Sequence, residues 1–121
     1  MVQINNRETG SSKELIAANY LKEKGYSIVD TNFRVRQGEI DIIAKDKETI
    51  VFVEVKYRNN TGSGHPLEAV GVAKQKKICK CAMFYINKYK IPIDLVSVRF
   101  DVVGILKDKI THIENAFDFI Y

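Results

Sequence analysis

The stretch GEIDIIAKDKETIVFVEVK, residues 38–56, predicts a β-hairpin and with it the sheet around which the chain folds. Both halves are rich in Ile and Val, and the polar residues between them suit a tight turn at residues 47–48. Side chains of a strand alternate between its two faces, so Glu54 and Lys56 project to the same side of the sheet. Pairing counted back from the turn places Asp41 opposite Glu54.

Two carboxylates that face each other across a strand pair repel, because directly paired residues bring their Cβ atoms to about 5 Å. A divalent cation between Asp41 and Glu54, with Lys56 beside it, would balance their charge. The alternative is a surface ladder of ion pairs made by the same three residues. The flanking Val and Ile residues favour the cation, because they indicate a largely buried sheet, where charges persist only with a partner or a function.

Length and composition describe one domain that spans residues 1–121. The hydrophobic content of 45% and charged content of 28% are typical of globular proteins, and no apolar run approaches the roughly 18 residues that cross a bilayer. The first residues lack a secretory signal, so we expect a cytoplasmic protein with no membrane contact. Cys79 and Cys81 would point to different sides of a helix and are expected to be free thiols.

The pattern outside the hairpin predicts helices before and after it and further strands around it. Apolar residues recur at helical spacing over residues 12–24, behind a loose arm at residues 1–10, and again over residues 72–88. Residues that favour strands occupy positions 26–35, 95–103 and 109–113. This order favours an α/β fold, in which a right-handed crossover through the second helix makes a mixed β-sheet flanked by helices.

A polar loop at residues 58–66 separates the hairpin from the second helix and is long enough to close over a ligand. Lysines gather in and after that helix, at Lys74, Lys76, Lys77, Lys80, Lys88 and Lys90. With a net charge of only +4, this cluster is either a solvated helix face or a contact surface for a polyanion. His65 and His112 lack a partner at a ligand-like spacing and are interpreted as surface or packing residues.

Two further glutamates are candidates for the same site. Glu14 shares a helical stripe with Leu21 and would face the sheet. It also completes a Ser11-x-x-Glu14 capping box, in which it would only close the start of the helix. Glu39 lies on the same strand face as Asp41 and is either a spare ligand or an exposed charge at the end of the strand.

The order of elements, with an Asp followed on the next strand by Glu-x-Lys, resembles the PD-(D/E)XK nuclease superfamily, whose restriction-endonuclease-like core is αβββαβ. More narrowly, four motifs look like the YraN-like family of bacterial proteins, which is related to Holliday junction resolvases. They are GEIDII at 38–43, FVEVKYR at 52–58, RFDVV at 99–103 and IENAF at 113–117. Ile40 replaces the proline for which the superfamily is named, a change that affects backbone shape but removes no ligand.

The resemblance implies a site for Mg²⁺ or Mn²⁺ held by Asp41, Glu54, the main-chain carbonyl of Val55 and, as in many members, Glu14. Lys56 would orient the attacking water or stabilise the charge that develops on the phosphate.

Four other residues are candidates for nucleic-acid contacts. Lys74 and Gln75 match the polar position that the helix after the motif often supplies in the family, where they would hold the scissile phosphate. Arg36 and Arg58 flank the acidic strands and are either phosphate contacts or solvated charges.

The implied activity is that of a metal-dependent endonuclease that hydrolyses DNA phosphodiester bonds, on branched or recombination structures by analogy with resolvases. Because resolvases work as symmetric dimers, the resemblance also suggests a homodimer. The alternative is a non-catalytic nucleic-acid-binding or adaptor protein that keeps the nuclease fold for its shape and charge.

Overall fold

Two helices and five strands make up the part of the chain that the computed structural model describes, residues 8–58 and 70–120. In chain order they are α1 (Glu8–Glu23), β1 (Ser27–Val35), β2 (Gly38–Asp46), β3 (Thr49–Arg58), α2 (Val72–Lys88), β4 (Ser97–Leu106) and β5 (Lys109–Ile113). The strands form one mixed sheet, so the predicted α/β fold is confirmed. Among these residues, no helix is both long and apolar enough to cross a membrane.

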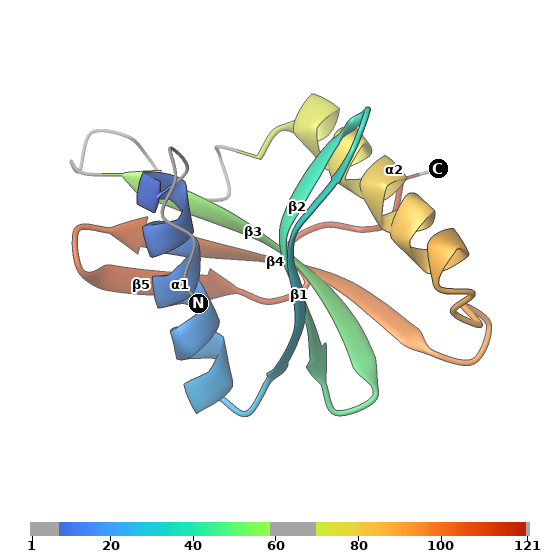
Figure 1. Ribbon diagram of the computed structural model, residues 1–121, viewed down its shortest axis with the longest axis horizontal. Coiled ribbons are helices and arrows are strands. Elements are labelled where there is room, and N and C mark those ends of the chain that lie inside the picture. Colours follow the sequence, from blue (N-terminus) through green and yellow to red (C-terminus); the bar gives the residue numbers. More distant parts are fainter. Residues whose placement is uncertain (1–7, 59–69, 121) are drawn as a thin grey trace.

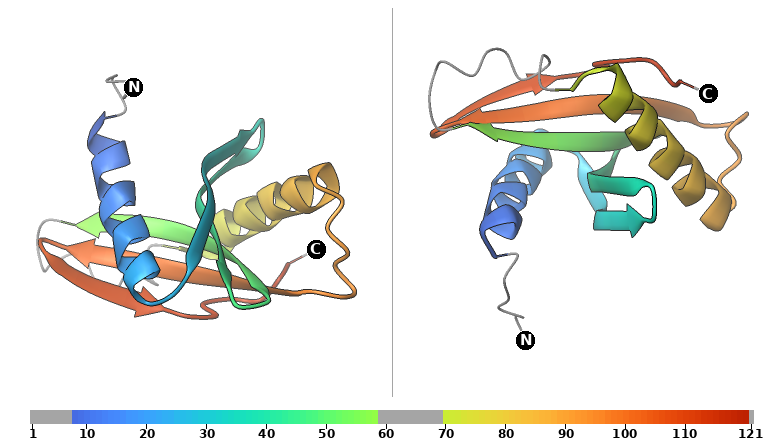
Figure 2. Two further views of the ribbon diagram at one scale, coloured as in Figure 1. Left: turned by 60° about the horizontal axis from the view of Figure 1, so that its bottom comes forward. Right: turned by 90° about the horizontal axis from the view of Figure 1, so that it is seen from above.

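The strands lie side by side in their chain order, from β1 to β5. Neighbours run antiparallel except β3 and β4, which are parallel and have α2 between them in the chain. This is the parallel return expected of a crossover through the second helix. The β1–β2 hairpin stands between the two helices, with α1 on one side and α2 on the other (Figure 1 and Figure 2). Each helix therefore covers its own hydrophobic core.

The two cores are built from alternate side chains of the same strands. The α1 core contains Ala17, Ala18, Leu21, Tyr26, Ile42, Ala44, Val51, Val53, Val103 and Ile105. The α2 core contains Ile40, Ile43, Phe52, Ile78, Cys79, Cys81, Ala82, Tyr85, Ile86, Phe100 and Val102, among others. The C-terminal tail packs on the α2 core through Phe117, Phe119 and Ile120, as its apolar composition predicts. Both cysteines are buried free thiols, also as predicted.

The β2–β3 hairpin has the register that its turn predicts. Asp46 pairs with Thr49, and the ladder runs as far as the pair of Ile42 and Val53. Residues 38–40 of β2 remain paired with β1, but this end of the strand continues past the last residue paired with β3 and lies beside α2 (Figure 1). The acid-bearing end of β2 therefore separates from β3 at the point where the candidate site begins.

The first helix begins earlier than the sequence predicts. The pattern indicated a start at Ser12, whereas α1 begins at Glu8, so the last residues of the expected loose arm are helical. Residues 1–7 of that arm lie outside the described part of the chain. Because Ser11 is inside the helix and not at its N-cap, the capping-box interpretation of Glu14 is wrong.

A buried ion network joins β4, β5 and the start of the tail. Asp101, whose side chain is wholly buried, accepts hydrogen bonds from Arg99 Nε at 2.9 Å, His112 Nε2 at 2.7 Å and the Asn115 backbone N–H at 3.0 Å. Burial alone would raise the pKa of Asp101, but the hydrogen bonds from His112 and Arg99 outweigh it and hold that pKa below the ordinary value of 3.8. His112 is therefore a packing residue, as interpreted from the sequence.

Replacing the acid of this network is expected to destabilise the fold. Asp101→Ala leaves the buried His112 ring and the partly buried Arg99 guanidinium without their shared partner, so the free energy of unfolding should fall by about 3 kcal/mol. Because the pKa of Asp101 is lowered by folding, its contribution is present above pH 3.8 and is lost as the pH falls below that value.

Urea denaturation at neutral pH measures this loss. Asp108→Ala, at an exposed position between β4 and β5, is the control and should change the free energy of unfolding by no more than about 0.5 kcal/mol. Equal losses in the two variants would show that the Asp101 network does not hold the strands together.

Candidate functional site

The candidate site lies where β2 leaves β3, and Asp41 is one of its two buried acids, with Glu54. Asp41 is 7% exposed, and its Oδ2 accepts a hydrogen bond of 2.8 Å from the backbone N–H of Val55. An antiparallel ladder would normally supply a main-chain carbonyl to this N–H. A carboxylate therefore takes over the hydrogen bonding of β3 just where its pairing with β2 stops.

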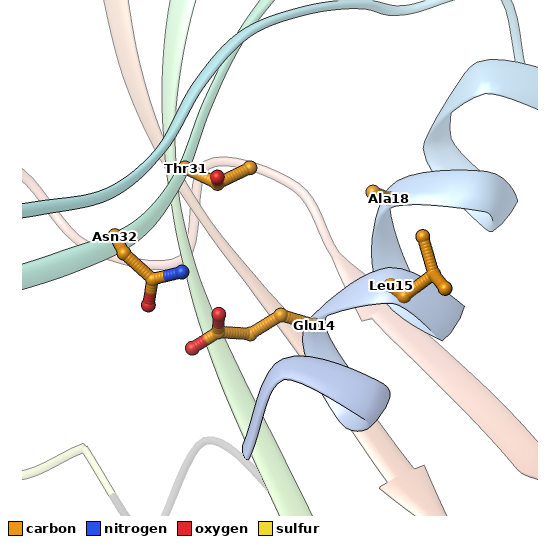
Figure 3. A pocket seen from close by; sticks show the side chains of 5 residues that line it. All are labelled: Glu14, Leu15, Ala18, Thr31 and Asn32. Carbon is orange, nitrogen blue, oxygen red and sulfur yellow. The ribbon is translucent and has the colours of Figure 1, made fainter. Parts of the chain in front are cut away.

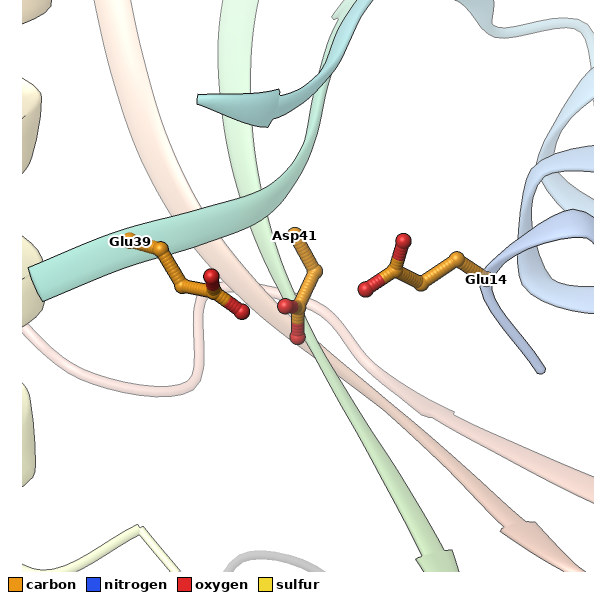
Figure 4. A group of neighbouring side chains, drawn as sticks. All are labelled: Glu14, Glu39 and Asp41. Atoms are coloured by element: carbon orange, nitrogen blue, oxygen red, sulfur yellow. The ribbon is translucent and has the colours of Figure 1, made fainter. Parts of the chain in front are cut away.

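Three carboxylates converge at this point. Glu14 on α1 and Glu39 and Asp41 on β2 each bring one oxygen to within 4.8 Å of the other two, and their side chains point toward one another (Figure 4). Among the residues that the structure describes, this is the one group whose ligand atoms lie close enough to share a metal ion. Carboxylate oxygens are the ligands that Mg²⁺ and Mn²⁺ prefer.

Glu14 reaches this group past a pocket between α1 and β1. The pocket has a volume of about 170 Å³ and is lined by Glu14, Leu15, Ala18, Thr31 and Asn32 (Figure 3). Asn32, at a left-handed backbone position with a φ of 54°, turns its amide toward the Glu14 carboxylate. The helical stripe predicted for Glu14 thus does face the sheet.

Glu54 is oriented differently from the sequence expectation. Its Oε2 lies 3.2 Å from Lys56 Nζ and 3.6 Å from Lys74 Nζ, and it is not part of the group of three carboxylates. The sequence predicted a cation between Asp41 and Glu54, with Lys56 beside it, and in the structure Lys56 and Lys74 are the cationic partners of Glu54. Lys74 comes from α2, so this helix reaches into the candidate site.

The crowding of negative charge changes the acidity of the site. Burial, together with the charge of Glu54 and smaller contributions from Glu14 and Glu39, raises the pKa of Asp41 from 3.8 to about 8, although the Val55 N–H opposes the change. Burial also raises the pKa of Glu14 despite its hydrogen bond with Asn32. Without a cation, Asp41 therefore holds a proton near neutral pH.

The other residues predicted to contact nucleic acid lie on three different elements. Gln75 donates a hydrogen bond of 2.9 Å from Nε2 to the carbonyl of Val70, at the start of α2. Arg58 ends β3, and Arg36 is exposed in the turn between β1 and β2. Most of the predicted polar loop, with His65, lies outside the described residues.

Glu39 is the acid that sequence reasoning left undecided. Its oxygen belongs to the group of three, yet its Oε1 also lies 2.8 Å from Nε of Arg34. Both interpretations therefore apply in part, because the side chain is near the surface and near Asp41. The sequence signal that pointed to a place for Glu39 in this group was its spacing of two residues from Asp41, which puts both side chains on one face of the strand. Asn32 was missed, because an Asn inside a strand predicted only an interruption.

Comparison with known proteins gives a family for the chain. Residues 13–105 match the family model described as uncharacterised protein family UPF0102. A UPF0102 protein of Lachnoclostridium phytofermentans is 47% identical over 115 residues, which cover 95% of this chain and 97% of that protein. A UPF0102 protein of Clostridioides difficile is 46% identical, with 94% and 100% covered, and one of Coxiella burnetii is 41% identical, with 95% and 96% covered. The chain belongs to the UPF0102 family, also known as the YraN family.

Proposed function

We propose that this protein is a metal-dependent endonuclease that hydrolyses DNA phosphodiester bonds, with branched or recombination structures as the substrates to test first. The observation that carries the proposal is the environment of Asp41, a buried acid whose neighbours are other acids. Asp101 in the same sheet is buried to a similar degree, but it has Arg99 and His112 as partners and a lowered pKa. Asp41 instead lies beside Glu14 and Glu39 and has a raised pKa, an arrangement that supports a role in binding an external cation.

The donor atoms around Asp41 fit Mg²⁺ or Mn²⁺. Glu14, Glu39 and Asp41 offer converging carboxylate oxygens, and Glu54 with the carbonyl of Val55 would complete the ligand set that the family resemblance implies. A divalent cation held by these residues would polarise a phosphoryl oxygen and lower the pKa of a bound water.

The protein's own residues would supply positioning and charge. Lys56 Nζ is held 3.2 Å from Glu54 Oε2, which fixes an ammonium group beside the carboxylates. There it would orient the attacking water or stabilise charge on the phosphate. Lys74 contacts Glu54, and with Gln75 on α2, Arg36 in the β1–β2 turn and Arg58 at the end of β3 it would hold the phosphate backbone.

Neutralising Asp41 is expected to stabilise the metal-free protein. A carboxyl group whose pKa is raised by folding costs stability at every pH above its pKa in the unfolded chain, because folding then forces it either to take up a proton or to stay ionised in an unfavourable place. Stability is therefore complete below pH 3.8 and falls as the pH rises toward about 8. Asn keeps an oxygen for the Val55 N–H but carries no charge, so Asp41→Asn should raise the free energy of unfolding at about pH 8 by on the order of 2 kcal/mol.

Urea denaturation in EDTA at about pH 5 and about pH 8 tests this, and the gain should be smaller at the lower pH. Adding Mn²⁺ should stabilise the wild type and leave Asp41→Asn unchanged. Asp108→Asn, which removes an exposed charge, is the matched control. A gain of the same size at both pH values would show that Asp41 is not under this electrostatic strain.

A cleavage assay tests the enzymatic part of the proposal. Linear duplex, single-stranded and four-way-junction DNA are incubated with the protein and Mg²⁺ or Mn²⁺. Cleavage by Asp41→Ala and Lys56→Ala should be at least about a hundredfold slower than by the wild type, because each removes charge from the reacting centre. Lys47→Ala, at the exposed far turn of the β2–β3 hairpin, should cleave like the wild type.

Two results would reject the enzyme. If the wild type leaves every DNA intact but binds it as well as both variants do, the protein is better described as a nucleic-acid-binding or adaptor protein that keeps the fold. If cleavage persists in Asp41→Ala and Lys56→Ala, the reaction takes place at another site or comes from a contaminant.

A further inference from the structure

Glu54 is the one acid of the candidate site that has two cationic partners. Its side chain is 6% exposed, and Lys56 and Lys74 both contact the same oxygen, Oε2. Asp41, its neighbour across the end of the β2–β3 ladder, instead groups with Glu14 and Glu39. In this arrangement Glu54 is paired with lysines and does not belong to the group formed by the other three carboxylates.

The two lysines differ in how firmly they are placed. Lys56 lies two residues after Glu54 on the same strand, so its ammonium group stays on the same face at all times. Lys74 reaches Glu54 from α2, its contact is longer, and 39% of its side chain is exposed. Solvent and ligands can reach Lys74, so its ion pair with Glu54 is the one that can be exchanged.

The helix that carries Lys74 is suited to a polyanion. Among the residues of α2, Val72–Lys88, five are Lys and none is Asp or Glu. Without these five, the chain has 14 Lys and Arg against its 15 Asp and Glu, so α2 carries the whole net positive charge. Lys74 also lies in the first turn, near the positive end of the helix dipole, where a cation is disfavoured and an anion is favoured.

We propose that Lys74 is a positioning residue that exchanges Glu54 for a substrate phosphate, so that binding of nucleic acid to α2 frees Glu54 to join the other carboxylates around the metal ion. The inference rests on the proposed function and specifies how its site is completed. A phosphate can replace Glu54 as the partner of Lys74 because it carries a negative charge and has several acceptor oxygens. Glu54 then retains Lys56 and lies beside Asp41.

This exchange couples two binding events. If nucleic acid raises the affinity for the metal ion by some factor, the metal ion must raise the affinity for nucleic acid by the same factor. Free protein would hold the metal weakly, and the complete set of ligands would form only where a phosphate is already in place. Hydrolysis would thereby be confined to bound substrate.

Calorimetric titration with Mn²⁺ in the absence of nucleic acid tests the role of Lys74. Lys74→Gln should bind Mn²⁺ at least about fivefold more tightly than the wild type, because Glu54 is released without a phosphate. Lys80→Gln, which removes an exposed charge from the same helix, should bind like the wild type. The urea midpoint of each variant shows that the fold is retained.

A double-mutant cycle separates this role from the general effect of removing a positive charge. In a Glu54→Gln background the gain from Lys74→Gln should vanish, because the lysine then has no carboxylate to restrain. The same titration is then repeated in the presence of a short DNA duplex, which is checked to be intact afterwards. The duplex should tighten Mn²⁺ binding to the wild type but not to Lys74→Gln.

The outcomes distinguish this inference from the proposed function. The coupling is wrong if Lys74→Gln binds Mn²⁺ like the wild type, if its gain persists in Glu54→Gln, or if the duplex leaves Mn²⁺ affinity of the wild type unchanged. In those cases a metal centre that depends on Asp41, and the nuclease, would still stand. If the wild type binds no Mn²⁺ either alone or with the duplex, the metal centre itself is wrong and both proposals fall.

Discussion

Burial of Asp41 among other carboxylates is the constraint on which the arrangement of the site depends. A buried acid with acidic neighbours must keep a proton, gain a cation or lose stability, and the raised pKa of Asp41 shows that the first applies to the protein alone. The surrounding elements supply the groups that act on the charge of Asp41. α1 supplies Glu14, β2 supplies Glu39, and the one hydrogen bond that favours the charged form comes from Val55.

Asp101 shows that the same fold can neutralise a buried acid when no ligand is needed. Its oxygens are satisfied by Arg99, His112 and a backbone N–H, and these contacts overcome the cost of burial. Both aspartates lie on central strands of one sheet, in the same protein and solvent. The difference between them is therefore one of local partners, and it is this difference that makes Asp41 a candidate for chemistry and Asp101 a part of the scaffold.

Local rules predicted those features that depend on neighbours in sequence. The Asp46–Thr49 turn set the register of β2 against β3, and helical and strand periodicity predicted the bounds of α2 and β5. The contact between Lys74 and Glu54 could not be predicted in this way, because it depends on how α2 packs against the sheet. The start of α1 was missed because the residues from Glu8 onward carry no apolar pattern, although the helix includes them.

The two isoleucines that flank Asp41 explain how its strand can leave the sheet. Strict alternation would place Ile40 and Ile42 on one face. Instead Ile42 packs in the α1 core and Ile40 in the α2 core, and both are almost wholly buried. β2 must therefore turn about its own axis between them, at Asp41. Burial of two large side chains on opposite sides stabilises this turn by about 1.5 to 3 kcal/mol each.

This turn also accounts for Ile40 at the position where the nuclease motif that the sequence resembles has proline. A proline would restrict the backbone there but would bury less apolar surface and donate no hydrogen bond. Ile40 anchors the departing end of β2 against α2, the helix that carries Lys74. The position of the carboxylates relative to that lysine thus depends on hydrophobic packing, so the geometry of the site is set by the cores on either side of it.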